Sequence, residues 1–270
     1  MTAGCGQTAV WVDGEFLTGE APVFTALDAA PRSGAGLFET LRAQRSGNPT
    51  LGLHLERLRA SAERLGYRAL PELDYEDVLR ALLARAGLEA ARFRLSFFPP
   101  DSGVRLVASV EPLPAGSDRG IVLRVSPYRR GRNDPTAAHK LVSRAFLDLA
   151  RREAELCGGD DAMLLGEDGE VLETTRANLF LVAGDGTLVT PAPNGSFLEG
   201  ITRARLLAAA RSSGVPVEER RVRVDEIHDA SELFVTNAIV GVAAVKEVDG
   251  DRFACPGQLE RWSGLLERDN

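Results

Sequence analysis

The sequence predicts an α+β fold divided into two domains, and three observations lead to that prediction. Strand patterns follow one another in runs, which favours long antiparallel stretches over regular βαβ alternation. Two amphipathic helical patterns interrupt the strands in the first third of the chain. The stretch "EPLPAGSDRG" (111–120) has the proline, glycine and serine content of a linker. We therefore expect a small domain over residues 1–112, a linker over 113–119 and a larger domain over 120–270.

The first domain is expected to contain two strand pairs, two helices and two further strands. "TAVWVDGEFL" (8–17) predicts a hairpin, because Asp13-Gly14 is a favoured two-residue turn. "GLFETLRAQRSGNPTL" (36–51) predicts a second strand pair that turns at 46–49. The helix over 54–67 should bury a leucine-rich stripe and leave His54 at its surface. A helix over 73–88 and strands over 91–98 and 103–113 complete this domain.

The second domain begins with a strand over 121–128. A helix is expected after Lys140 and should end at Gly158. Its apolar stripe consists of Leu141, Ala145, Leu149 and Ala154. Strands separated by glycine-containing turns should then cover 162–191, and "GITRARLLAAARSSG" predicts a helix over 200–214. The last strands are expected over 215–222, 232–238 and 241–248.

The composition is typical of a soluble globular protein. The 270 residues are 44 % apolar and 26 % charged, with a net charge of −7 and no basic block, so no nucleic-acid partner is expected. The sequence contains no apolar run of membrane-spanning length and no secretory signal, so we expect no membrane partner and a cytoplasmic location. Cys5, Cys157 and Cys255 are odd in number and widely spaced, which fits neither a disulfide framework nor a metal site.

Lysine is rare in this chain, because Lys140 and Lys246 are the only two among 32 basic residues. Arginine stays protonated, whereas a desolvated lysine can lose its proton and act as a nucleophile or a base. The alternative is that both lysines are remnants of an arginine-rich codon usage. Lys246 stands near a turn and is interpreted as a solvated cation. Lys140 lies between a strand and a helix, which leaves a chemical role open.

Polar residues stand at the ends of several expected elements. Backbone N–H groups at a helix start, as in "EGITRARLL" (199–207), can bind an anion. A lysine for a Schiff base, a carboxylate for a pyridine nitrogen and an arginine for a phosphate are the parts that pyridoxal phosphate requires. Each part taken alone also has a structural explanation, as a solvated charge or a helix cap. The residues concerned are Arg57, Lys140, Glu173, Asn178, Ile201, Thr202, Thr236 and Asn237.

Seven motifs, in their order along the chain, resemble the fold-type IV pyridoxal phosphate enzymes, the class IV aminotransferase family. They are "GLFETLR" (36–42), "HLERL" (54–58), "SPYRRGRN" (126–133), "HK" (139–140), "EVLETTRANLFLV" (170–182), "EGITR" (199–203) and "LFVTNAIVGVAAV" (233–245). The resemblance implies a small α/β sandwich domain and a larger pseudo-barrel domain. It also implies a homodimer with the active site between the two domains, and an amine or amino acid as the substrate.

The resemblance further implies a role for each matching position. Lys140 corresponds to the Schiff-base lysine, Glu173 to the carboxylate on the pyridine nitrogen, and Arg57 to the phosphate arginine. Asn178 corresponds to a support for the loop after Glu173. The remaining phosphate contacts would come from the helix start at Ile201 and Thr202 and from the strand end at Thr236 and Asn237.

Three features resemble the 4-amino-4-deoxychorismate lyases of this family. These are "SPYRRGRN", Arg144 four residues after Lys140, and "TNA" (236–238); Ala145 stands where branched-chain enzymes have tyrosine. We therefore expect a lyase that releases pyruvate and forms 4-aminobenzoate, as in folate biosynthesis. Arg144 would contact the substrate, with a structural ion pair as the alternative.

Two other functions remain open at this point. The stretch "SFFPPDSG" (96–103) lacks the arginine of the lyase loop, so a class IV aminotransferase acting on D- or branched-chain amino acids is the alternative. A homologue that has lost catalysis and serves as a binding protein is the third possibility. The intact set of Lys140, Glu173 and Arg57 argues against that third interpretation.

Overall fold

The computed structural model describes residues 8–19, 21–99, 105–114, 120–253 and 259–268. It divides the chain into two compact units. The first unit is Met1–Ala115 with His139–Ser143, and the second is Gly116–Ala138 with Arg144–Asn270. The domains expected over 1–112 and 120–270 stay a prediction, and most of the linker lies outside the described residues. The segment that carries Lys140 is grouped with the first unit, although it follows the linker in sequence.

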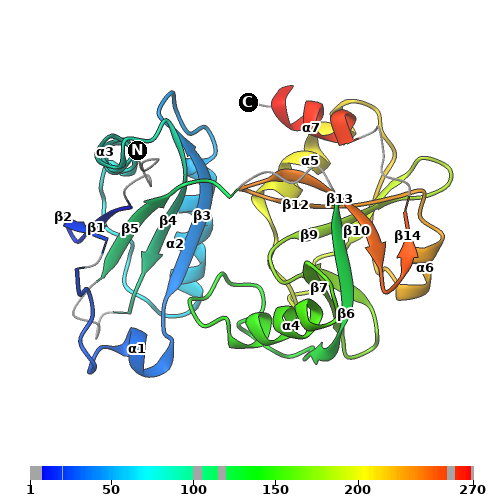
Figure 1. The fold of residues 1–270 in the computed structure, drawn as a ribbon, viewed down its shortest axis with the longest axis horizontal. Helices are drawn as coiled ribbons and strands as arrows, with labels where there is room; N and C mark the ends of the chain where they lie inside the picture. The colour runs from blue at the N-terminus through cyan, green and yellow to red at the C-terminus, as the bar shows by residue number, and fades with distance from the viewer. Residues whose placement is uncertain (1–7, 20, 100–104, 115–119, 254–258, 269–270) are drawn as a thin grey trace, which may run out of the picture. The chain divides into compact units, whose positions relative to one another are not determined.

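The first unit is built on a five-stranded antiparallel sheet. Its elements are β1 Ala9–Val12, β2 Glu15–Thr18, α1 Ala29–Ser33, β3 Leu37–Gln44, α2 Leu51–Arg64, α3 Tyr75–Ala86, β4 Ala90–Phe97 and β5 Leu106–Glu111. The strand order is β2-β1-β5-β4-β3, and α2 lies along one face of the sheet (Figure 1). The expected hairpin is confirmed, because β1 pairs with β2 around Asp13 (φ 46°) and Gly14 (φ 111°), the positive φ angles that a tight turn requires.

The second strand pair expected over 36–51 is wrong. β3 forms as expected, but its partner is β4, with Leu37 opposite Phe97. The Asn48 side chain closes the following turn by accepting from the Gln44 N–H and donating to the Gln44 carbonyl oxygen. Helix α2 begins directly after this turn, so no residues remain for a returning strand.

Alternate residues of β3 are buried toward α2. Glu39 belongs to this otherwise apolar row and is only 2 % exposed. On α2 the buried stripe includes His54, which is 1 % exposed, so the expectation of a surface histidine is wrong. His54 lies three residues after one buried leucine and four before another, the spacing that repeats along one helical face.

The second unit is built on one nine-stranded sheet. Its strands are β6 Ile121–Arg130, β7 Asp161–Gly166, β8 Val171–Thr174, β9 Asn178–Val182, β10 Leu188–Pro191, β11 Val217–Arg220, β12 Glu232–Asn237, β13 Gly241–Val248 and β14 Asp251–Arg252. The order β9-β12-β13-β6-β7-β8 closes into a barrel, because β8 also pairs with β9. Three pairings, β6–β7, β6–β13 and β10–β11, are parallel and join the expected antiparallel stretches.

Both faces of the barrel strands are covered by apolar groups. Leu179 and Leu181 of β9 enter one apolar cluster with other barrel residues. Phe180, between them, stacks on Phe234 with ring centroids 5.2 Å apart, in a second cluster that includes residues of α5 and α7. Figure 1 shows α5 and α7 side by side. The helices of this unit are α4 Ala145–Leu156, α5 Ile201–Ser212, α6 Val224–His228 and α7 Leu259–Arg268.

Some sequence expectations concern general features of the chain. None of the described helices is long and apolar enough to span a membrane. Cys157 is a free and exposed cysteine, while Cys5 and Cys255 lie outside the described residues. Four residues of the stretch 96–103, from 100 onward, also lie outside them.

Candidate active site

Lys140 lies on a short segment that pairs with β3. The Phe38 N–H donates to the Lys140 carbonyl oxygen at 2.9 Å, and Leu141 forms an isolated β-bridge with Leu37. The Lys140 Nζ is 4.8 Å from the centroid of the Phe38 ring, within the range of a cation–π interaction. Leu141 was expected on a helical stripe; it is paired with β3 instead, because α4 begins only at Ala145.

Further contacts hold this segment on the first unit. The Val142 N–H donates to the Gly36 carbonyl oxygen at 2.9 Å, and His139 Nδ1 lies 3.0 Å from Ser61 Oγ on α2. Gly36 has a φ of 149°, and a Cβ there would lie 2.8 Å from the Phe98 ring and 2.9 Å from the Val142 side chain. Only glycine fits this position. The first residue of the "GLFETLR" motif therefore allows the lysine-bearing segment to approach β3.

Arg57 and Glu39 form a forked ion pair on the same unit. Arg57 Nε donates to Glu39 Oε1 at 2.8 Å, and Arg57 Nη2 donates to Glu39 Oε2 at 2.7 Å. His54 Nδ1 lies 2.7 Å from the same Oε2. Both oxygens of the buried carboxylate are thus engaged by side chains of α2, and the guanidinium is held by its Nε–Nη2 edge.

Burial and hydrogen bonding act in opposite directions on these groups. Burial raises the pKa of the Glu39 carboxyl, but the hydrogen bonds from His54 and Arg57 outweigh it and lower that pKa from 4.5 to about 2. Burial lowers the pKa of His54. The hydrogen bond and charge of Glu39 raise this pKa, and the positive charges of Arg57 and Lys140 lower it further, so that the net shift is downward. His54 is therefore neutral near pH 7 and donates from Nδ1 to Glu39. Its buried Nε2 has no hydrogen-bond partner in the described part of the chain.

Glu173 lies on β8 of the second unit and is 7 % exposed. Arg130 Nη1 is 3.8 Å from Glu173 Oε1 and donates to the carbonyl oxygens of Ala137 at 3.2 Å and Ser196 at 3.3 Å. Arg130 therefore ties the Glu173 carboxylate to two loops of this unit. Sequence reasoning missed Arg130 as a site residue, and its place in the "SPYRRGRN" motif was the only signal.

Asn178 links the Glu173 hairpin to the start of α5. It stands opposite Glu173 in the β8–β9 pairing, and its Nδ2 donates at 2.8 Å to a backbone carbonyl oxygen in the loop before α5. Gly200 is the N-cap of α5, and a Cβ there would lie 2.1 Å from Asn178 Oδ1. These contacts with the loop before α5 and with Gly200 are of the kind that the expected supporting role of Asn178 requires. Ile201 and Thr202 form the first turn of this twelve-residue helix, where backbone N–H groups can bind an anion.

Thr236 and Asn237 end β12 but have different surroundings. The Thr236 Oγ1 is buried and has no hydrogen-bond partner among the residues that the structure describes. The Asn237 Oδ1 accepts from the N–H groups of Ile239 at 2.9 Å and Val240 at 3.0 Å, so it closes the turn toward β13. The Thr236 hydroxyl is therefore the better donor for an incoming anion at this strand end.

Arg144, the expected substrate contact, is the N-cap of α4. Its Nη2 donates to the Thr175 carbonyl oxygen at 2.8 Å, and its Nε lies 3.8 Å from Asp148 Oδ1. The Arg144 side chain is 23 % exposed. These contacts favour the structural alternative for Arg144, because its charge is engaged by its own helix and by the loop that follows β8.

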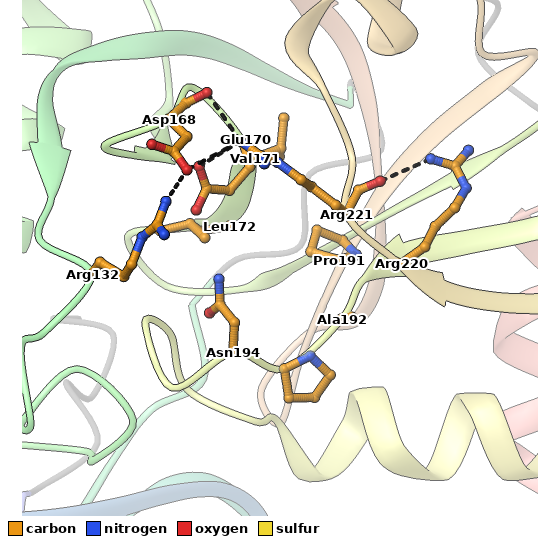
Figure 2. A pocket seen from close by; sticks show the side chains of 11 residues that line it. Arg132, Asp168, Glu170, Val171, Leu172, Pro191, Ala192, Asn194, Arg220 and Arg221 are labelled. Atoms are coloured by element: carbon orange, nitrogen blue, oxygen red, sulfur yellow. Dashed lines mark hydrogen bonds and ion pairs between the residues drawn. The ribbon is translucent and has the colours of Figure 1, made fainter.

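The second unit also contains a cavity of about 350 Å³, lined by both charged and apolar side chains (Figure 2). Arg132 and Arg221 both pair with Asp168, and Arg221 Nη2 lies 3.5 Å from Glu170 Oε2. None of the expected site residues is among those that line this cavity. The lining residues are Arg132, Asp168, Glu170, Val171, Leu172, Pro191, Ala192, Pro193, Asn194, Arg220 and Arg221.

Comparison with known families decides what kind of protein carries these residues. Residues 36–248 match the family model described as amino-transferase class IV. The chain belongs to the class IV aminotransferases. The resemblance is therefore confirmed at the level of the family, and so is the fold, a sheet barrel with a separate sheet domain.

Relatives of this class IV aminotransferase carry two kinds of name. A Thermotoga maritima protein, "Probable branched-chain-amino-acid aminotransferase", is 34 % identical over 221 residues, which cover 80 % of this chain and 78 % of the relative. A Brucella abortus aminotransferase solved with bound PLP has a TM-score of 0.86 at 25 % identity, covering 97 % of this chain and 98 % of that one. A Legionella pneumophila protein, provisionally assigned as a 4-amino-4-deoxychorismate lyase, has a TM-score of 0.83 at 28 % identity, covering 93 % and 97 %. The names of curated relatives favour the aminotransferase alternative over the expected lyase.

Pyridoxal 5′-phosphate is the cofactor of this class IV aminotransferase, as family membership and PLP-bound structures of similar proteins show. The residues of the chain fit this group. Thr236 Oγ1 is a buried hydroxyl without a partner among the described residues, so it can donate to a phosphate. The backbone N–H groups in the first turn of α5 are suitable donors as well. The Lys140 amine and the Glu173 carboxylate would supply the two other functional groups that the cofactor needs.

Proposed function

We propose that this protein is a PLP-dependent aminotransferase that moves an amino group from an amino acid to a 2-oxo acid, with branched-chain amino acids as the preferred class. The observation that carries the proposal is the 34 % identity to the Thermotoga maritima relative, over four fifths of the chain. A Pseudomonas aeruginosa branched-chain-amino-acid aminotransferase, 29 % identical over 89 % of this chain, supports it. The contacts of Arg144 also support it, because the arginine expected to select a lyase substrate has a structural use.

Lys140 and Glu173 have the central roles in this proposal. When bound, the cofactor supplies an aldehyde that bonds to amines and a protonated ring that withdraws electrons from the bonded carbon. Lys140 Nζ would hold the aldehyde until a substrate amine takes its place. The freed Nζ would then accept the proton of the substrate carbon that bears nitrogen and give it back later in the reaction. Glu173 would accept a hydrogen bond from the ring N–H, and Arg130, 3.8 Å away, would help to orient its carboxylate.

In the same proposal the phosphate is held by one side-chain cation and several hydrogen-bond donors. Arg57 would contribute its guanidinium. Ile201 and Thr202 would contribute their N–H groups, and Thr236 its hydroxyl. Asn178 and Asn237 support the loops beside these donors. All of these roles follow the family resemblance, position by position.

Replacing each of the two lysines by arginine tests the proposal. Wild-type protein should be yellow, retain the cofactor after borohydride reduction, and transfer amino groups from branched-chain L-amino acids to a 2-oxo acid. Lys140→Arg should lose all three properties while its far-UV circular dichroism stays unchanged, because arginine cannot bond to the aldehyde. Lys246→Arg is the matched control and should retain all three. Formation of 4-aminobenzoate from aminodeoxychorismate, with no activity on L- or D-amino acids, would overturn the proposal in favour of the lyase.

A further inference from the structure

We propose that Glu39 is a positioning residue for the cofactor phosphate. It fixes the plane and direction of the Arg57 guanidinium, and His54 in turn fixes Glu39. The inference rests on the proposed role of Arg57 in holding the phosphate. It adds a carboxylate and a histidine that act only through that arginine.

The position of Glu39 calls for an explanation beyond stability. Its carboxylate lies in a row of apolar residues on β3 and is 2 % exposed. Burying such a charge is costly, and a buried ion pair is often no more stable than well-packed apolar residues of the same volume. The three donors from Arg57 and His54 stabilise the ionised carboxylate, but an apolar residue at this position would need no such donors. The fork is better explained by what it does to Arg57.

The fork restricts the guanidinium in a way that phosphate binding needs. A guanidinium is planar and binds phosphate through two parallel N–H bonds, so its plane must be set before the phosphate arrives. Glu39 engages the Nε–Nη2 edge with bonds of 2.8 and 2.7 Å, which sets both the plane and the direction of the Nη1 end. Without this fork, a long side chain that is 19 % exposed can adopt several rotamers.

The same strand also positions Lys140. Phe38, the residue before Glu39, donates its N–H to the Lys140 carbonyl oxygen and lies under the Lys140 Nζ. Two adjacent residues of β3 therefore hold the amine that meets the aldehyde and the cation that meets the phosphate. Both groups belong to one compact unit, so their separation is set by a single strand and the helix beside it.

Charge and orientation lead to opposite expectations for Glu39→Gln. Removing the carboxylate takes away a negative charge beside Arg57, so a purely electrostatic role predicts tighter binding of the phosphate dianion. A positioning role predicts weaker binding, on the order of 10- to 100-fold, the size seen when partners that orient metal ligands are removed. The sign of the change therefore separates the two roles.

The experiment compares PLP with pyridoxal, which has the aldehyde but no phosphate. Apoprotein of wild type, Glu39→Gln and Arg57→Lys is titrated with each compound, and bound aldehyde is followed by its visible absorbance. Glu39→Gln should weaken PLP binding and leave pyridoxal binding unchanged, whereas a general loss of structure would weaken both. Arg57→Lys keeps the charge but cannot form the fork, so it should weaken PLP binding as well. In the Arg57→Lys background, Glu39→Gln should then cause no further loss of PLP affinity. Glu56→Gln, an exposed carboxylate on α2, is the control and should bind both compounds like wild type.

The outcomes distinguish failure of this inference from failure of the proposed function. Loss of PLP affinity in Arg57→Lys but not in Glu39→Gln overturns the role of Glu39 and leaves Arg57 as the phosphate arginine. Equal losses of PLP and pyridoxal affinity in Glu39→Gln overturn it too, because the effect does not act on the phosphate. Unchanged PLP affinity in both variants overturns the role of Arg57 itself. Absence of any covalent adduct in wild type refutes the proposed function.

Discussion

The Glu39 carboxylate should contribute measurably to the stability of the first unit, with a defined pH dependence. Its pKa is lowered from 4.5 to about 2, and each pKa unit corresponds to about 1.4 kcal/mol. The ionised carboxylate therefore contributes about 3 kcal/mol. A glutamine at this position still accepts one hydrogen bond, worth about 1 kcal/mol. We expect Glu39→Gln to lower the free energy of unfolding by about 2 kcal/mol near neutral pH.

The sign of the pH dependence follows from the direction of the shift. Because the folded state binds the Glu39 proton less tightly than the unfolded state, the contribution is fully present above the unfolded pKa, near 4.5. It is lost as the pH falls through the folded pKa of about 2. The difference between wild type and Glu39→Gln should therefore be constant at neutral pH and shrink steadily in acid.

The two tryptophans allow this measurement to be made on the first unit. Trp11 is on β1 and Trp262 is on α7 of the second unit, and both are buried. In a Trp262→Phe background, the fluorescence of Trp11 follows unfolding of the first unit in urea. The proteins with and without Glu39→Gln are compared in this background from about pH 7 to about pH 3, the range in which a carboxylate contribution is lost. Glu56→Gln should show no difference. A loss that does not change with pH would refute the reasoning, because it would have to arise from packing.

Two further variants test the second unit. Thr236→Val should weaken PLP binding while the free energy of unfolding of the apoprotein stays the same or rises, because the hydroxyl has no protein partner among the described residues. Cofactor titration measures the first quantity and urea unfolding the second. Unchanged PLP affinity would contradict the prediction. Gly200→Ala should weaken PLP binding, because its methyl group would meet Asn178 Oδ1 at 2.1 Å. Gly52→Ala, on α2 with no atom within 4 Å of the added methyl, is the control and should bind PLP normally with equal or higher stability.

Local signals in the sequence predicted most elements, and non-local pairings were the main omission. Asp13-Gly14 specifies a turn by itself, so the first hairpin could be read directly. The turn at Asn48 was also recognised, but the partner of β3 is β4, more than forty residues along the chain. The pattern within β3 contains no information about that partner. The three parallel pairings of the second unit were missed for the same reason.

The candidate site was predicted where residue type alone is informative. A rare lysine and a glycine before a helix can be recognised without a structure. Glu39 could be recognised only because it alternates with Leu37 and Leu41 and so lies on the same face of β3. His54 was assigned to the wrong helix face, because a histidine beside charged residues resembles a surface position. Its burial depends on a carboxylate that is fifteen residues away in sequence and reaches it only in the folded unit.

The register of β3 connects these observations. Its pairing with β4 extends along the whole strand, from Leu37 to Gln44. A slip by one residue would turn Glu39 to the opposite face of the sheet, away from Arg57 and His54. The same slip would move the N–H that meets the Lys140 carbonyl oxygen. One structural variable, the register of this strand, thus sets the positions of both the proposed aldehyde-binding amine and the proposed phosphate-binding cation. Substitutions that disturb the β3–β4 pairing should therefore affect cofactor binding even when they lie far from Lys140.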